Sequence, residues 1–172
     1  MANTYTLIET KTLAASAASV TFSSIPATYT DLVLRISARD DVANYVQAIN
    51  CRVNGLTTGI YSYTSLYDSA GTTGSDADTN NTLSAMSYGS TSANATATTF
   101  SNAEFYFPSY TSTENKPASW TSASENNSTN GYLVAHAKLF ATTAAITTIL
   151  LYPNSGNFVT NSTFYLYGIS KS

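Results

Sequence analysis

The amino-acid sequence predicts an all-β protein, folded as a single antiparallel β-sandwich domain over residues 1–172. Composition is the first reason, because 28 Thr, 24 Ser and 13 Tyr stand beside only 7 basic residues, 10 acidic residues and 1 His. Thr and Tyr fit a pleated, half-buried surface, whereas Ser fits turns. The second reason is that short apolar or alternating runs are separated by polar turn stretches, which is typical of a sandwich or barrel. The third is that no long stretch has the apolar spacing of an amphipathic helix.

Nine segments carry the pattern expected of strands. In chain order they are Thr4–Thr10, Ala18–Phe22, Asp31–Ala38, Val46–Val53, Ile60–Leu66, Ala103–Phe107, Gly131–Leu139, Thr147–Tyr152 and Thr163–Ile169. Residues 135–145 are also compatible with a helix. We favour a strand, a turn and a second strand there, because the threonines at 142, 143, 147 and 148 are β-branched and poor helix formers.

Three of these segments alternate clearly between apolar and polar residues. The apolar faces are Leu32, Leu34 and Ile36 in the third segment, Ile49, Cys51 and Val53 in the fourth, and Ala103, Phe105 and Phe107 in the sixth. One buried face and one solvated face is typical of an antiparallel sheet. These nine residues are therefore expected to form part of the core.

Two long polar stretches are expected to be surface loops, at about 68–81 and 111–130. The first reads DSAGTTGSDADTNN, and the second holds Trp120, the only tryptophan of the chain. Long polar loops on a rigid sheet scaffold are where binding residues usually lie. We therefore expect partner contacts in these two stretches.

Charge and hydropathy exclude several classes of partner. The seven basic residues are scattered and the net charge is −3, so no nucleic-acid face is expected. No apolar run is long enough to cross a membrane, and the first residues lack the pattern of a signal peptide. Cys51 is the only cysteine, so no intrachain disulfide can form, and we expect it to be a small buried residue.

Residues suited to catalysis or metal binding are few and isolated. Asp76 and Asp78, with Asp68 nearby, form an oxygen-rich D-x-D that could attract calcium, but the EF-hand spacing is missing and a solvated turn is favoured. His136 is the only histidine and lies in an apolar run, without a second ligand or a G-x-S-x-G motif nearby. We therefore predict a protein that is not an enzyme, with no catalytic, cofactor or metal residue.

Four aromatic residues are the candidate interface residues: Tyr61, Tyr63, Tyr67 and Trp120. Aromatic rings pack in cores, anchor protein interfaces and stack on sugars. The sequence leaves these three alternatives open. It favours some exposure or an interface, because so many tyrosine hydroxyls need partners.

Three segments carry a resemblance to a known group of proteins. They are YTLIET (Tyr5–Thr10), FSSIPATYTDLVLRISAR (Phe22–Arg39) and STFYLYGIS (Ser162–Ser170). Together they resemble small virion structural proteins of tailed bacteriophages. The segment Gly55–Tyr132 matches nothing in that group. The matching residues belong to the framework of the fold, so they do not distinguish a head protein from a tail protein.

The resemblance implies a jelly-roll-like β-sandwich that serves as a capsid decoration (cement) protein and stabilises the head. It also implies a major capsid protein as partner, self-association as a homotrimer, and a place on the exterior of a virion assembled in the host cytoplasm. The alternative is a tail-fibre or receptor-binding module that contacts host surface glycans. The absence of a coiled-coil or fibrous repeat favours the decoration protein.

Overall fold

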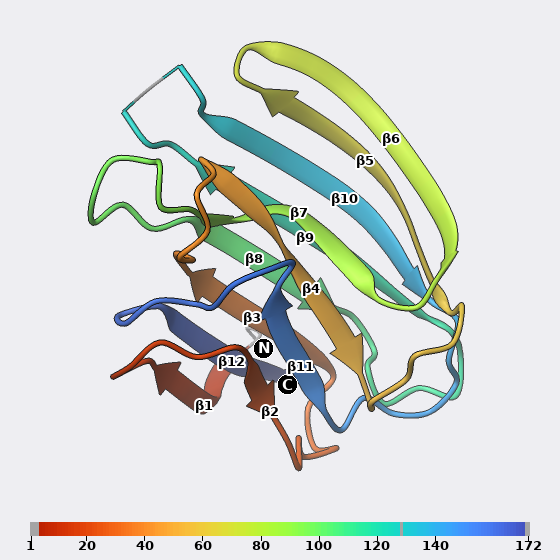
Figure 1. The fold of residues 1–172 in the computed structure, drawn as a ribbon. Coiled ribbons are helices and arrows are strands. Elements are labelled where there is room, and N and C mark those ends of the chain that lie inside the picture. Colours follow the sequence, from red (N-terminus) through yellow and green to blue (C-terminus); the bar gives the residue numbers. More distant parts are fainter. Residues whose placement is uncertain (1–3, 128, 171–172) are drawn as a thin grey trace.

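The computed structural model describes residues 4–127 and 129–170, which form twelve strands and no helix (Figure 1). The strands are β1 (Thr4–Thr12), β2 (Val20–Phe22), β3 (Asp31–Ser37), β4 (Val46–Val53), β5 (Tyr61–Ser69), β6 (Thr72–Asn81), β7 (Ser84–Thr91), β8 (Asn102–Phe107), β9 (Lys116–Ser124), β10 (Tyr132–Phe140), β11 (Ile149–Pro153) and β12 (Thr163–Ser170). Within these two ranges, no helix exists that could cross a membrane.

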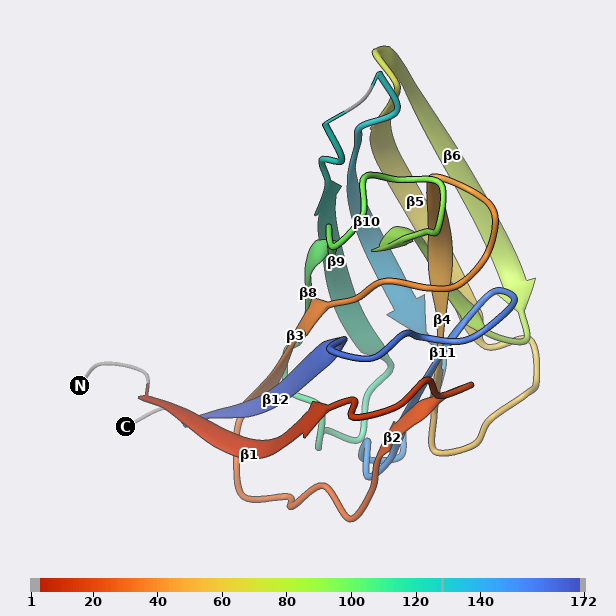
Figure 2. The same cartoon turned by 60° about the vertical axis from the view of Figure 1, so that its left-hand side comes forward.

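The strands form two antiparallel sheets that pack as a sandwich in one domain. The large sheet has eight strands in the order β1-β12-β3-β8-β9-β10-β5-β6, and the small sheet has four in the order β2-β11-β4-β7. Strands β9, β10, β5 and β6 form one half of the large sheet, which we call the wing. The wing rises away from β1, β12 and β3 (Figure 2). Only β7 of the small sheet makes extensive contact with the wing, against β9, β10 and β5.

The core lies between the two sheets and contains the apolar faces expected from the sequence. All nine residues at the alternating positions of β3, β4 and β8 are buried, which confirms that part of the prediction. Aromatic rings join the sheet halves across the core, with the ring of Phe105 edge-on to Trp120 at 5.8 Å and Phe140 edge-on to Tyr61 at 5.2 Å. Cys51 is buried and free, as expected.

The segments that carry the phage resemblance contact one another at framework positions. A Cβ at Gly168 would overlap the ring of Tyr29, so the last strand needs glycine at that position. The guanidinium of Arg39 donates to four backbone carbonyls between residues 93 and 99. These residues hold the sandwich together, so they belong to the framework of the fold.

The expected all-β sandwich is confirmed, but the two expected loops are wrong. Strand β6 fills most of 68–81, β9 lies in the middle of 111–130, and β7 was not expected at all. The sequence lacks the usual signal because Ser, Thr, Ala and Asp occupy most positions of these strands. Their hydrogen bonds to β5, β10 and β4 form the strands, and tertiary pairing of this kind overrides weak β-propensity.

The hairpin between β5 and β6 has a two-residue turn. Ser69 pairs with Thr72, and the intervening Ala70 and Gly71 have φ values of 54° and 81°. Positive φ at both central residues defines the type I′ turn, whose twist matches that of paired strands. The carboxylate of Asp68 accepts a hydrogen bond from the backbone nitrogen of Gly71 at 3.0 Å, so this aspartate is used locally to close the turn.

The Trp120→Ala variant should unfold more easily than the parent protein, and the substitution should not act only on a surface contact. The side chain is fully buried, so its removal leaves a large cavity and should lower the free energy of unfolding by about 3–5 kcal/mol. Urea denaturation followed by fluorescence or circular dichroism measures this change. The neighbouring exposed Ser119→Ala serves as the control and should change stability by less than about 0.5 kcal/mol. Equal stability of the two variants would contradict the core assignment.

Candidate interaction surface

The well-exposed large apolar side chains of the described residues all lie on one face of the molecule. They are Tyr5, Leu7, Leu66, Leu133 and Leu139, with exposed fractions between 40% and 68%. These residues come from β1, β5 and β10, which are all strands of the large sheet. Their strand neighbours turn toward the small sheet, because successive side chains of a strand point to opposite faces. The outer face of the large sheet is therefore the candidate site.

Strand β10 has an unusual distribution of polar and apolar residues. His136 and Lys138 point into the sandwich and are buried, while Leu133 and Leu139 point outward and are exposed. An ordinary half-buried strand has the opposite arrangement, with apolar residues inside and charged residues outside. The outward leucines cannot be explained by filling the core of this domain. They mark the outer face of the wing as a surface suited to contact with another molecule.

The buried polar side chains of β10 are held between β5 and β7. The amine of Lys138 donates to the carbonyl of Ala85 at 2.7 Å and lies 5.0 Å from the ring centroid of Tyr63. Burial lowers the pKa of Lys138 to about 7, and burial together with the neighbouring Lys138 lowers the pKa of His136 to about 3. Neither ring nitrogen of His136 has a hydrogen-bond partner in the described structure. The imidazole is therefore neutral and is not arranged as a general base.

The outward side chains of β9, β10 and β5 form a surface that we call the wing face. It consists of small or apolar residues: Thr64, Leu66, Ser119, Thr121, Ala123, Leu133, Ala135, Ala137 and Leu139. Leu66 pairs with Ala135 across β5 and β10, and Leu133 pairs with Ala123 across β10 and β9. A depression of about 490 Å³ lies between Leu66, Leu133 and Thr121, with Ala135 at its floor.

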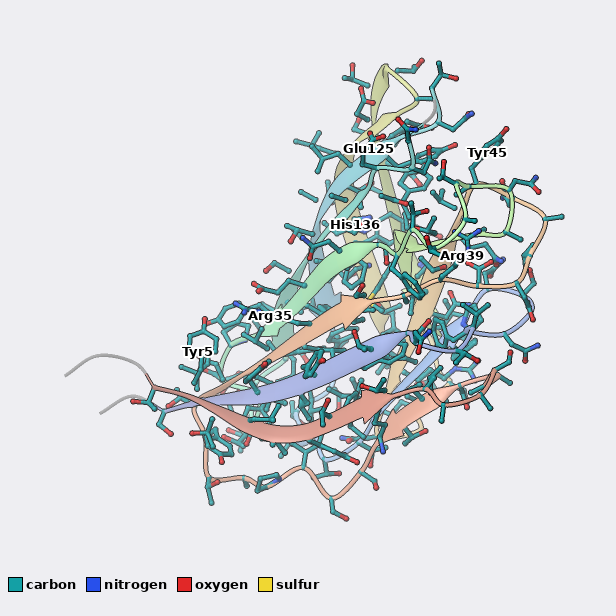
Figure 3. The ribbon with its side chains drawn as sticks, turned by 90° about the vertical axis from the view of Figure 1, so that its left-hand side faces the viewer. Tyr5, Arg35, Arg39, Tyr45, Glu125 and His136 are labelled. Atoms are coloured by element: carbon teal, nitrogen blue, oxygen red, sulfur yellow. The ribbon has the colours of Figure 1, made fainter. Side chains whose placement is uncertain are left out.

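A second cluster lies on β1, β12, β3 and β8 of the same outer face, and we call it the Tyr–Arg patch; it borders the wing face where Glu104 pairs with Thr121. It is formed by Tyr5, Leu7, Arg35, Glu104 and Tyr167. The guanidinium carbon of Arg35 lies 5.8 Å from the ring centroids of both Tyr5 and Tyr167, and its Nε is 3.1 Å from Oε2 of Glu104. Tyr5 and Arg35 lie close together in Figure 3, well separated from His136 of the wing. Exposed ion pairs and cation–π contacts of this kind add little to the free energy of unfolding. Their main effect is to hold the guanidinium and the tyrosine rings in one orientation.

The four aromatic residues predicted as interface residues do not form a surface patch. Tyr61 and Trp120 are buried in the core, so their assignment to an interface is wrong for this fold. The hydroxyl of Tyr61 donates to the carbonyl of Leu56 and accepts from the backbone nitrogen of Val53, while the indole nitrogen of Trp120 donates to the carbonyl of Ser87. The hydroxyls that seemed to require a partner molecule are thus satisfied within the chain.

Tyr63 and Tyr67 are half-buried on the inner side of β5. The hydroxyl of Tyr63 donates to Oδ2 of Asp76 at 2.8 Å, and the ring of Tyr67 meets the ring of Tyr88 edge-on at 6.1 Å. Burial and the bond to Asp76 raise the pKa of Tyr63 to about 12. Both tyrosines hold the wing strands and β7 together, and they do not reach the exposed outer face.

The acidic residues of the chain have local structural partners. Asp40 is fully buried and accepts hydrogen bonds from Ser90, Ser92 and Gln47, at 2.5, 2.8 and 3.2 Å. Asp76 accepts the hydroxyl of Tyr63 as described above. Over residues 4–127 and 129–170, no three His, Cys, Asp or Glu side chains come together as a group that could hold a metal ion.

The sequence did not reveal the exposed residues of the outer face, because it does not show which of the two sides of a strand points into the core. Leu133 and Leu139 are easily taken for core residues, since each stands beside other apolar residues in YLVAHAKLF. The available signal was that the even-numbered positions of this segment carry Tyr, Val, His, Lys and Phe, while the odd-numbered positions carry Leu and Ala. Either set could face inward, and only pairing with both neighbouring strands decides between them.

Comparison with known proteins does not assign a family. No protein-family description matches the chain, and no similar sequence is found among curated proteins.

Lys138 should make the stability of the protein depend on pH. Its pKa is about 7 in the folded protein and near 10.5 when unfolded, so above pH 7 the unfolded chain binds the proton more strongly. The free energy of unfolding should therefore rise between pH 7 and about 8.5, by at most about 1.4 kcal/mol per pH unit from this group. Urea denaturation at both pH values measures the change.

The variant Lys138→Met is the matched comparison, because it keeps the length of the side chain and removes its charge. Its unfolding free energy should change less over the same pH interval. The Cys51 thiol of the unfolded chain begins to ionise as the pH approaches about 8.5, but it does so equally in the parent protein and the variant, so the difference between them reports Lys138. The same pH dependence in the parent protein and the variant would contradict the buried, neutralised lysine.

Proposed function

We propose that this protein is a virion structural protein, a capsid decoration (cement) protein, that attaches to its partner through the outer face of the large sheet. The observation that carries the proposal is the confinement of the exposed large apolar side chains to that one face. The described residues offer a surface for binding and no group of side chains arranged for a reaction. The virion assignment itself comes from the resemblance of the framework segments.

The strand order supports this assignment. We infer a jelly roll in which β1-β12-β3-β8 and β2-β11-β4-β7 are the two four-stranded halves, and the hairpins β5–β6 and β9–β10 are insertions that extend the first half. Jelly rolls occur in capsid proteins and also in lectins, so the topology alone fits either reading. Strands β5, β6 and β9 lie inside Gly55–Tyr132, so most of the wing belongs to the segment that carries no resemblance.

We assign the contact with the shell protein to the Tyr–Arg patch. Tyrosine and arginine are the residues most enriched at the centres of protein interfaces, because they supply large contact areas and directional hydrogen bonds. Arg35 and Glu104 carry opposite charges on an exposed surface, so both can form pairs with a partner that presents the complementary charges. A major capsid protein on the exterior of the particle is the partner that the resemblance implies.

Attachment would stabilise the shell by mass action. A protein that binds the assembled shell and not its separated subunits lowers the free energy of the assembled state by RT ln(1 + L/Kd) per site, where L is its free concentration. Many copies on one particle multiply this effect. Such a role requires a rigid, neutral domain and a binding surface.

Truncating the central arginine of the Tyr–Arg patch should weaken attachment without unfolding the protein. The variant Arg35→Ala should bind particles that lack this protein with an affinity about 30-fold lower, since truncation of a central arginine typically costs about 2 kcal/mol. Co-sedimentation with particles measures binding, and release of the genome on heating measures stabilisation. The control is Arg52→Ala, because Arg52 makes a similar contact with Tyr152, at 5.5 Å, on the small sheet.

An experiment with particles that lack the protein separates the proposed function from its alternative. Particles that lack the protein should assemble, adsorb to host cells and burst at a lower temperature. Particles that keep full heat stability and lose adsorption would contradict the decoration role and support the receptor-binding module that contacts host glycans.

A further inference from the structure

We propose that the wing face binds a second copy of this chain, in a two-fold contact that packs the outer surfaces of two large sheets against each other. The wing face shares no residue with the Tyr–Arg patch, although Glu104 borders it at Thr121, and the inference does not depend on the protein being part of a virion. Three properties of the face carry it: its polarity, its lack of charge and its shape.

The first property is the exposure of Leu66, Leu133 and Leu139 on two adjacent strands. A single exposed leucine is ordinary on a protein surface. Here the same strand, β10, exposes two leucines and buries a histidine and a lysine. Burying Lys138 and leaving the imidazole of His136 without a partner are both unfavourable in the isolated domain. The arrangement becomes favourable when the outer face is also covered, because the leucines then leave water.

The second property is neutrality. Among the outward positions of β9, β10 and β5, Asp68 at the end of β5 is the only charged residue, and its carboxylate is bonded to the β5–β6 turn. A two-fold contact places a surface against an identical surface, so any charge near its centre would face its own copy. A neutral face avoids this repulsion. The Tyr–Arg patch, with Arg35 and Glu104, instead suits a different partner.

The third property is the combination of size and relief. Strands of nine residues are about 30 Å long, and the three strands of the wing face are about 15 Å wide, which gives roughly 450 Å² per copy. The exposed outward side of β6 raises this to roughly 600 Å². A stable interface buries about 800 Å² per partner, so the wing face together with β6 has most of the required area.

The wing face carries both projecting side chains and hollows. The 490 Å³ depression beside Leu66 and Leu133 is accompanied by a second, of about 410 Å³, between Leu66, Ala135 and Ser119. Projecting leucines and hollows over small residues therefore lie side by side on one surface. Side chains of two sheets packed face to face interdigitate in this way, at a separation of about 10 Å. Because projection and hollow belong to the same face, the contact closes as a dimer, in contrast to the homotrimer that the resemblance implies.

The mass of the purified protein in solution tests this contact. Sedimentation equilibrium should give twice the chain mass of 18.2 kDa for the parent protein. The double variant Leu66→Ser, Leu133→Ser should dissociate more than about tenfold more readily, because each leucine is lost twice per dimer. The control is Leu7→Ser, which removes an equally exposed leucine of the same sheet outside the wing face and should remain a dimer. Circular dichroism checks that both variants are folded.

Cross-linking provides a second, independent measurement. Ala135→Cys places a thiol on the floor of the wing face, and a short bismaleimide should join two copies of this variant. Thr21→Cys, at an exposed position of β2 in the small sheet, should give no such product. Cys51 is buried and does not compete. A monomer at the highest concentrations, a dimer that survives the double leucine variant, or a trimer would each overturn the two-fold contact.

Discussion

The pairing of β10 with β5 on one side and with β9 on the other is the constraint on which the wing depends. Both ladders run over the full length of the strand without a register shift. A slip of one residue would exchange its faces, placing Leu133 and Leu139 inside and His136 and Lys138 outside. The observed register is held at one end by Phe140, whose ring packs against Tyr61 and Phe107 in the core. This end cannot slip without leaving a cavity at the centre of the sandwich.

The wing follows from that constraint. The small sheet has only four strands and covers the large sheet through β7 at this end, so β6 is exposed on both faces along almost its whole length. Strand β6 tolerates this because it is composed of Thr, Ser, Asp, Asn, Ala and Gly. An edge strand with Asp76 and Asp78 also resists pairing with a further chain through its free edge. The proposed association is thereby directed away from the edge and toward the outer face of the large sheet.

The two clusters on the outer face differ in chemistry, and this difference separates their roles. The Tyr–Arg patch is aromatic and charged, which suits recognition of a partner with its own complementary groups. The wing face is neutral and apolar, which suits contact with an identical surface. Under the two proposals above, the wing face would contact a second copy of the chain and the Tyr–Arg patch a different partner. The neutral imidazole of His136 contributes to packing and not to reactivity.

The sequence by itself determined the fold class and the inner core, because β3, β4 and β8 alternate apolar and polar residues strongly enough to define their own buried faces. It also determined that Cys51 would be a buried single thiol. It did not determine β6 and β9, whose Ser- and Thr-rich segments become strands only when a partner strand supplies the hydrogen bonds. Nor did it place Trp120 in the core or Leu133 and Leu139 on the surface. Those assignments depend on which of two possible faces points inward, and only pairing between segments distant in the sequence decides that phase.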